Sequence, residues 1–446
     1  YDGTSRFMKD QRWNFFPSFS LGWNVARENF WKPLESVVNQ FKLRGSWGEL
    51  GNQNTSNLYP FYEILPVKSN SGNWLVNGGK TNTADIPSLV STLLTWERVR
   101  SFNVGFDFGA FSNRLTGSFD YFVRKTVDMV GPAPQLPLVL GIAPAIVNNA
   151  DMKSYGFEIE LSWRDRIGEV DYGVKFNLAD AQQKVVKYPN TTNAFNDWYA
   201  GKMSGEIWGY TSLGIAKTDE EMKEHLASLP NGGQNQLGNK WGAGDIMYAD
   251  INGDGKVDGG KGTLADPGDQ RIIGNSTPRY NFGLVLDASY KGFDVSIFFQ
   301  GVGKRDYAPI VGTNGAVFWG AVNNIWQSMA MEEHFDYFRP EGHPMGANLN
   351  GYYPRPDFTS NKNHQVQTRY LQDASYIRLK NLQIGYTLPK QWINKLHINR
   401  CRVYVSGDNL WTGTSLASMF DPQTLAAGDW GSGKTYPLSK VISFGL

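Results

Sequence analysis

Hydrophobic and polar residues alternate with a period of two along most of this 446-residue chain. The hairpin at residues 280–300 shows the pattern most clearly. One face of its first strand carries apolar side chains, namely Phe282, Leu284, Leu286, Ala288 and Tyr290. The other face carries Asn281, Gly283, Asp287 and Ser289, with Val285 as the one apolar exception. A two-residue turn, Lys291-Gly292, leads into a second strand with the same alternation. This period predicts β-strands with one apolar and one polar face.

The same alternation predicts about eleven strands in all. Besides the two strands of the hairpin, we expect strands near residues 13–24, 41–50, 101–110, 115–125, 153–164, 172–178, 376–388, 402–411 and 438–446. Within residues 376–388 the apolar positions change parity between Leu379 and Leu382. A β-bulge near Lys380-Asn381 restores the register in this interpretation, because a bulge adds one unpaired residue to a strand.

The connections between the expected strands alternate in length. Short connections fall near residues 25–40, 111–114, 165–170, 291–292 and 389–400. Long connections fall near residues 51–95, 126–151, 187–277, 308–370 and 412–435. Short periplasmic turns and long extracellular loops are typical of outer-membrane barrels, whereas a soluble sandwich has no reason to sort its loops in this way. The pattern therefore predicts an all-β fold, a transmembrane antiparallel β-barrel. Single-chain bacterial barrels have even strand numbers, so we expect the chain to be the C-terminal part of a larger barrel.

Composition and charge agree with this class. Aromatic residues make up 14% of the chain, with 15 Trp and 49 Gly, as girdles and turns of a large barrel require. The 43 Lys and Arg balance 42 Asp and Glu, so nothing indicates a nucleic-acid partner. Glu158 and Glu160 lie on one strand face and point into the lumen, whereas a glycosidase pair faces its substrate from opposite sides. We find no nucleophile motif and no phosphate loop, and we expect no enzyme.

Residues 250–258 match a calcium loop. Oxygen-bearing side chains stand at its positions 1, 3 and 5, and Gly255 at position 6 permits the tight turn. Position 12 is Lys261, which cannot bind a cation, and an insertion displaces the expected acidic residue to Asp269. The candidate ligands are Asp250, Asn252, Asp254, Lys256 (by its carbonyl), Asp258 and Asp269. We expect either a structural calcium ion that orders an extracellular loop or a turn held by hydrogen bonds alone.

Tryptophans in the expected long loops are the candidate contacts for a substrate or a lid protein. They are Trp198, Trp208, Trp241, Trp319 and Trp326. Their rings suit stacking on sugars or packing against peptide side chains, and the alternative is that they pack within the loops themselves. His334, His343 and His364 lack the spacing of a metal site.

Several stretches resemble SusC/RagA-type TonB-dependent transporters of Bacteroidetes outer membranes. The stretches are RWNFFPSFSLGW at 12–23, FKLRGSWGELGN at 41–52, DINGDGKVD at 250–258, RIIGN at 271–275, PRY at 278–280, YIRLKNLQIGYTLP at 376–389 and SGDNLW at 406–411. The resemblance implies a 22-stranded barrel whose first half, plug domain and TonB-binding segment are absent from this chain. It also implies a SusD-like surface lipoprotein as a lid, TonB as the energy source acting through the plug, and outer-membrane lipid around the barrel.

Three functions follow as hypotheses. The first is active import of oligosaccharides or oligopeptides across the outer membrane. The second is a passive outer-membrane channel, and the third is a secreted soluble β-rich glycan-binding protein. A plug encoded upstream of Tyr1 excludes the second, and partitioning into the membrane fraction excludes the third.

Overall fold

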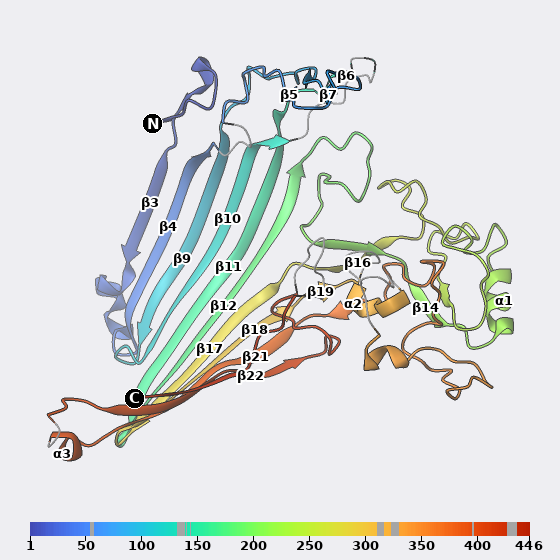
Figure 1. Ribbon diagram of the computed structural model, residues 1–446. Coiled ribbons are helices and arrows are strands. Elements are labelled where there is room, and N and C mark those ends of the chain that lie inside the picture. Colours follow the sequence, from blue (N-terminus) through green and yellow to red (C-terminus); the bar gives the residue numbers. More distant parts are fainter. Residues whose placement is uncertain are drawn as a thin grey trace.

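The computed structural model describes residues 1–53, 58–131, 139, 141–142, 144–309, 316–322, 330–394, 397–425 and 435–446. Its main feature is an eleven-stranded antiparallel sheet in which every strand pairs with its neighbours in sequence order, from β3 at one edge to β23 at the other. Figure 1 shows these strands side by side, with short turns at one end of the sheet and long loops at the other. The all-β, antiparallel prediction is confirmed, and the sheet is open between β3 and β23.

The strands of the main sheet are β3 (Ser18–Asn24), β4 (Val38–Asn52), β9 (Glu97–Ala110), β10 (Leu115–Gly131), β11 (Val147–Ile167), β12 (Val170–Lys187), β17 (Arg279–Tyr290), β18 (Phe293–Lys304), β21 (Tyr376–Thr387), β22 (Arg402–Thr414) and β23 (Val441–Gly445). Shorter strands are β1 (Asp2–Gly3), β2 (Trp13–Asn14), β5 (Val67–Lys68), β6 (Leu75–Val76), β7 (Gly79–Lys80), β8 (Thr83–Ala84), β13 (Glu206–Gly209), β14 (Ser212–Ile215), β15 (Ile246–Tyr248), β16 (Arg271–Asn275), β19 (Asp306–Tyr307) and β20 (Gln372–Asp373).

The helices are short. The α-helices are α1 (Asp219–Ala227), α2 (Ala316–Trp319) and α3 (Lys390–Ile393), and the 3-10 helices are η1 (Lys9–Gln11), η2 (Val25–Arg27), η3 (Asn29–Leu34), η5 (Gly320–Val322) and η6 (Glu332–Phe335). Helix α1 begins where the Thr218 side chain accepts a hydrogen bond from Glu221 N at 3.1 Å. Three acidic residues in its first turn suit the positive end of the helix dipole. No helix among the described residues is long and apolar enough to cross a membrane.

Cross-strand rows show how the alternation divides the two faces. One row on the outward face contains only apolar side chains, from β3 to β17: Trp23, Leu43, Phe106, Phe119, Ile159, Leu178 and Phe282. The adjacent row, one residue along each strand, is polar from β4 to β12 and faces inward: Lys42, Asp107, Ser118, Glu160 and Asn177. Because the period is two, this one-residue step moves every side chain to the opposite face.

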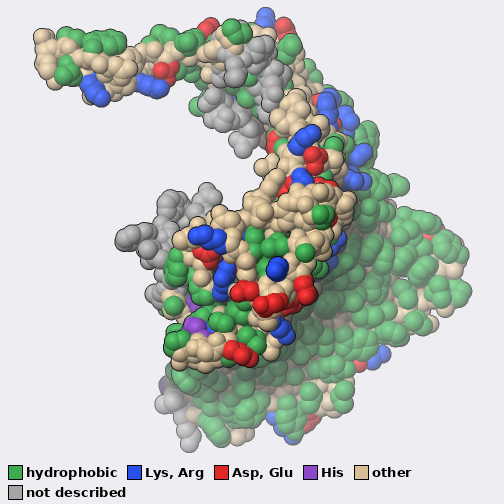
Figure 2. Space-filling view, turned by 90° about the vertical axis from the view of Figure 1, so that its right-hand side faces the viewer, with side chains coloured by type: hydrophobic (Ala, Val, Ile, Leu, Met, Phe, Trp, Pro, Cys, Tyr) green, Lys and Arg blue, Asp and Glu red, His purple; other side chains and the backbone are tan. Residues whose placement is uncertain are grey.

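The apolar outward face is not covered by a second layer. Leu21 is 79% exposed and Phe102 is 46% exposed. The right side of Figure 2 shows hydrophobic side chains covering a continuous area of this face. A soluble sandwich buries its apolar face against another sheet. The exposed face is instead the lipid-facing surface that a transmembrane barrel requires.

Two local predictions are confirmed. The Lys291-Gly292 turn has positive φ at both residues, 44° and 90°, which is the geometry of a type I′ hairpin turn. The pairing of β21 with β22 shifts register between Leu379 and Asn381, at the expected bulge.

The long loops differ from expectation in two ways. The loop expected over residues 126–151 is shorter, because β10 continues to Gly131 and β11 already begins at Val147. The alternation is lost there at bulges beside Met129, which hides the strand ends from a strict period-two pattern. The loop expected over residues 187–277 is not irregular throughout, because it contains small antiparallel strand pairs and helix α1.

Candidate functional site

Three long loops fold into one unit at the long-loop end of the sheet, which we call the loop module (Figure 1). They are the segments between β12 and β17, between β18 and β21, and between β22 and β23. Their shared hydrophobic core consists of Tyr210, Leu229, Ile246, Tyr248, Val257, Tyr307, Phe318, Trp319, Tyr353, Tyr370, Ala374, Leu416, Phe420 and Leu425. The loop module is therefore a packed structure and not a set of independent loops.

A buried ionic cluster joins two of these loops. The Asp245 carboxylate is fully buried and accepts two hydrogen bonds from Arg355, from Nε at 2.7 Å and from Nη2 at 2.6 Å. Lys362 Nζ lies 2.9 Å from Asp245 Oδ2, and Asn363 Nδ2 donates to Asp245 Oδ1 at 2.9 Å. A buried carboxylate is tolerated only when it is paired and hydrogen-bonded, and this cluster meets that condition. No local sequence pattern marks this cluster, because its partners lie more than 100 positions apart.

The predicted tryptophans occupy different environments. Trp319 is 2% exposed in the shared core, and its Nε1 donates to Pro309 O at 3.0 Å. Trp241 packs against the core with Lys362 Nζ 4.9 Å from its ring centroid, and Trp208 stacks on Phe195 at 4.6 Å. Trp198 is the more open of the four, with 38% exposure.

Trp326 lies outside the described residues. In this structure Trp319 packs within the loops, which is the alternative that the sequence left open. Contact of these tryptophans with a substrate or lid stays a prediction.

The predicted calcium loop folds as a hydrogen-bonded turn. Asp250 accepts from Gly253 N at 2.7 Å and from Gly255 N at 2.8 Å, and Asn252 Oδ1 accepts from Asp254 N at 3.0 Å. Gly255 has φ of +78°, as the expected tight turn requires. The side chains at positions 1, 3 and 5 therefore hold the turn by accepting hydrogen bonds from its backbone.

The other predicted ligands, Lys256, Asp258 and Asp269, lie together beside this turn. Asp269 is fully buried and accepts from Ile251 N at 2.7 Å and from Asp258 N at 2.8 Å. Burial raises the pKa of Asp269, while the Lys256 ammonium, 2.5 Å from Asp258, lowers the pKa of that carboxyl. Among the described residues, no three His, Cys, Asp or Glu side chains surround one point as a metal site would. Calcium binding stays a prediction, and it requires Lys256 to release Asp258.

An apolar hollow of about 180 Å³ opens on the loop module. Its lining includes Trp319, His334, Phe335, Tyr353, Phe358 and His364. His364 is 3% exposed and its ring centroid lies 4.6 Å from that of Trp319. Burial lowers the pKa of His364 to about 4, so its imidazole is neutral at physiological pH. The sequence reasoning missed this hollow because its residues come from separate parts of a long loop.

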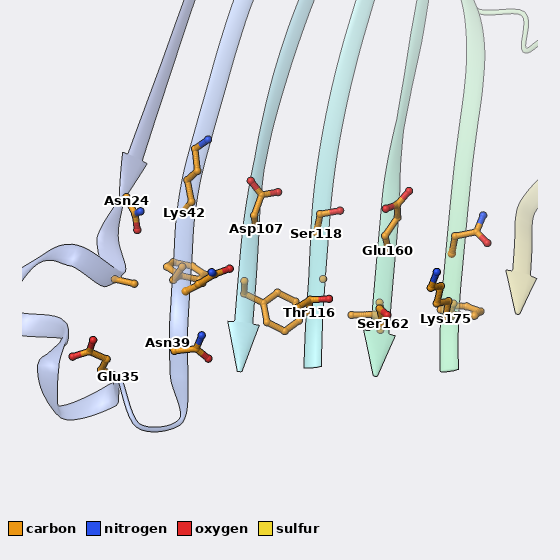
Figure 3. A pocket seen from close by; sticks show the side chains of 18 of the residues that line it. Asn24, Glu35, Asn39, Lys42, Asp107, Thr116, Ser118, Glu160, Ser162 and Lys175 are labelled. Carbon is orange, nitrogen blue, oxygen red and sulfur yellow. The ribbon is translucent and has the colours of Figure 1, made fainter. Parts of the chain in front are cut away.

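The inward face of the sheet carries the polar wall of the lumen. A hollow of about 1030 Å³ lies against it at the short-turn end, and Lys42, Asp107, Ser118 and Glu160 stand side by side on neighbouring strands there (Figure 3). Nearby, Arg44 donates to both carboxylate oxygens of Asp120 at 2.5 Å and to Asp107 at 3.1 Å, which joins β4, β9 and β10. This wall therefore carries both signs of charge, with cations on β4 and carboxylates on β9 to β11.

An outward face open to lipid, a polar lumen and a folded loop module define the wall of an outer-membrane β-barrel of the receptor and transporter class. The chain belongs to the family described as TonB dependent receptor-like, beta-barrel, whose model matches residues 1–410. It is an outer-membrane protein of this class, and its named relatives are receptors and transporters rather than enzymes.

Individual relatives confirm the resemblance to the SusC/RagA type. The chain is 30% identical over 475 residues to TonB-dependent receptor P3 of Formosa agariphila, covering 100% of this chain and 43% of that protein. It is 23% identical over 462 residues to TonB-dependent receptor SusC of Bacteroides thetaiotaomicron, covering 100% of this chain and 41% of that protein. The solved RagAB peptide transporter matches with a TM-score of 0.71 and 23% identity, over 98% of this chain and 43% of that chain. The chain thus spans less than half the length of these relatives.

Proposed function

We propose that the complete protein imports oligomeric nutrients, either oligosaccharides or oligopeptides, across the outer membrane with energy from TonB. TonB would act through a plug domain that lies outside this chain. The observation that carries the proposal is the combination of a polar lumen wall with a packed loop module at the long-loop end of the same sheet. A passive channel needs the wall but has no need of a large folded module held at one end.

A SusD-like surface lipoprotein is the proposed lid, and the loop module is its proposed docking site. Large apolar side chains stand open on the module, with Phe335 at 54%, Met345 at 56% and Phe358 at 63% exposure. Exposed apolar clusters rimmed by polar residues favour a protein contact. The solved RagAB structure is named a peptide transporter, which supports import of oligopeptides as one function of the complete protein.

The substrate class stays open between glycans and peptides. Neighbouring opposite charges on the lumen wall, such as Lys42 opposite Asp107, suit the charged termini and side chains of peptides. The exposed ring of Trp198 suits either a sugar face or an aromatic side chain. Both substrates therefore belong in the test.

The test uses the full-length protein with an affinity tag, expressed in its native outer membrane. Copurification with one lipoprotein in equal amounts supports the lid, as measured by mass spectrometry of the purified complex. Uptake of labelled oligopeptides and labelled oligosaccharides is then compared in cells with and without TonB. Uptake that stops without TonB supports active import, whereas uptake that continues unchanged shows a passive channel.

Calcium is proposed as a structural ion of the loop module. Asp250, Asn252 and Asp254 would supply side-chain oxygens, and Lys256 its backbone carbonyl. Asp258 and Asp269 lie next to this turn and would complete the oxygen set once Lys256 turns away. The ion would stiffen the loop and take no part in chemistry.

A further inference from the structure

Four cationic side chains form one row across neighbouring strands near the long-loop end of the sheet. Arg100 of β9 stands opposite Lys125 of β10. Lys125 stands opposite Lys153 of β11, which in turn stands opposite Lys184 of β12. We call these four residues the cation row. Neighbouring strands lie about 4.8 Å apart, so the row is about 14 Å wide.

The cation row lies on the lipid-facing side of the sheet. Two residues nearer the short-turn end of each strand, on the same face, are Phe102, Val123, Tyr155 and Gln182, and Trp47 of β4 stands opposite Phe102. This second row is rich in aromatic rings, and aromatic side chains of barrels lie at the membrane interface. A step of two residues along a strand tilted by about 40° advances about 5 Å across the membrane. The cation row therefore lies just beyond the aromatic level, at the depth of lipid headgroups.

The right side of Figure 2 shows hydrophobic and cationic side chains in separate areas of this face. Hydrophobic side chains cover its lower area, and Lys and Arg side chains gather above them. The long stems of lysines can pack along apolar surface while their ammonium groups reach the headgroup level. The order of the layers is thus apolar, aromatic and then cationic toward the extracellular side.

Among the described residues, three of the four cations of this row have no ion-pair partner. Arg100 pairs with Glu49, with Nε 2.6 Å from Oε1. Lys125, Lys153 and Lys184 make no ion pair among the described residues, although Lys153 Nζ lies 5.2 Å from the centre of the Tyr155 ring. Residues 132–146, which connect β10 to β11, include no Asp or Glu in their sequence. In the described part of the chain, three neighbouring positive charges therefore have no acidic partner.

We propose that the cation row binds the phosphate groups of anionic lipids in the outer leaflet of the outer membrane. Like charges directly opposite one another on adjacent strands repel, so an external anion stabilises the row. Phosphate accepts charge-assisted hydrogen bonds from Lys and Arg, and a headgroup with several phosphates can contact more than one lysine at once. The headgroup would thereby fix the depth and the lipid neighbours of β9 to β12. The proposal is independent of the imported substrate.

The test measures lipid binding to the complete receptor in neutral detergent by native mass spectrometry. The probes are a phosphorylated outer-leaflet glycolipid and the same glycolipid after enzymatic dephosphorylation. We expect the phosphorylated form to bind more tightly and its binding to weaken as salt is raised. The variant Lys125→Gln/Lys153→Gln/Lys184→Gln should bind it about 100-fold less tightly, since each cation near an anionic lipid contributes close to a factor of five.

Matched variants separate this site from general surface charge. Lys80→Gln/Lys217→Gln/Lys223→Gln removes the same charge from the loops and should leave lipid binding unchanged. Lys125→Arg/Lys153→Arg/Lys184→Arg keeps the charge and should retain it. Equal binding of the dephosphorylated glycolipid, or full binding by the glutamine variant, would overturn the proposal. Displacement of the lipid by an equal amount of inorganic phosphate would also overturn it, because the row would then be a site for the free ion.

Discussion

Lys362 and Asp245 form an ion pair of 2.9 Å between side chains that are 1% and 0% exposed. They belong to different long loops and are 117 positions apart in the sequence. Lys362 also donates to the carbonyl oxygens of Asn239 at 3.1 Å and Lys240 at 3.0 Å. The pair therefore holds the β12–β17 loop against the β18–β21 loop inside the loop module.

Removal of the lysine charge should open this contact. We expect Lys362→Met to destabilise the loop module by about 3–5 kcal/mol, because it leaves the buried Asp245 carboxylate short of a cation. Hydrogen exchange of the loop amides in the full receptor measures the free energy of local opening. The matched control is Lys68→Met. The ion pair of Lys68 with Asp85 is 2.5 Å long, but the side chains are 58% and 45% exposed, so we expect a loss below about 1 kcal/mol. Equal losses in the two variants would contradict a special role for the buried pair.

His364 should make the loop module sensitive to acid. Burial lowers its pKa from 6.5 to about 4 in the folded protein, so the unfolded chain binds the extra proton more readily. The stability of the module is then full above pH 6.5 and falls as the pH drops toward 4, by up to about 3 kcal/mol. Local opening measured by hydrogen exchange at several pH values checks this. His364→Gln removes the titrating group, and its pH dependence in this range should be smaller. An identical pH profile for the variant would show that other groups cause the effect.

Calcium should protect the turn at residues 250–258. We expect added calcium to slow hydrogen exchange and proteolysis in this turn of the full receptor, with a chelator reversing the effect. Asp254→Asn should weaken binding at least severalfold, because it removes a negative ligand. Asp266→Asn is the control, since it removes a nearby acid outside the predicted ligand set. Protection that is the same with and without calcium would leave the turn as a purely hydrogen-bonded structure.

The two faces of the sheet should respond oppositely to a new charge. Phe106→Arg places a cation in the middle of the apolar outward row and should destabilise the inserted barrel by about 2–4 kcal/mol. Ser118→Arg places the same charge on the adjacent inward row beside Asp107 and Glu160. We expect the inward variant to fold and insert normally. A folded barrel migrates differently on gels before and after heating, so this shift measures folding of the full receptor. An equal loss of folded barrel in both variants would contradict the assignment of faces.

The fold was predictable because the alternation of side chains is strict where one face meets lipid. Leu43 and Phe106 could not exchange faces with Lys42 and Asp107 without placing charges in hydrocarbon, so pattern and register agree. The bulge after Leu379 was also predictable, since it leaves a change of parity in the sequence. The ends of β10 and β11 were not, because they rise beyond the lipid, where polar and apolar faces are no longer distinct.

The candidate sites were less predictable than the fold. The tight turn at residues 250–258 was predictable because its residues are local in sequence, and calcium binding there stays a prediction. The Asp245 cluster depends on contacts between two loops, and the hollow beside His364 on contacts between separate parts of one loop, so no local pattern marks them. The burial of Trp319 was not predictable either, because it follows from the core that Phe318 and Tyr370 build around it.

The shared core of the loop module also constrains how this protein can change over evolution. Tyr248, Phe318 and Phe420 come from three different loops, yet they belong to one buried cluster. A gene exchange that replaced only one loop would leave unmatched apolar surfaces on the other two. A new specificity would therefore be inherited most readily as one block that includes all three loops, while the strands beneath them vary independently.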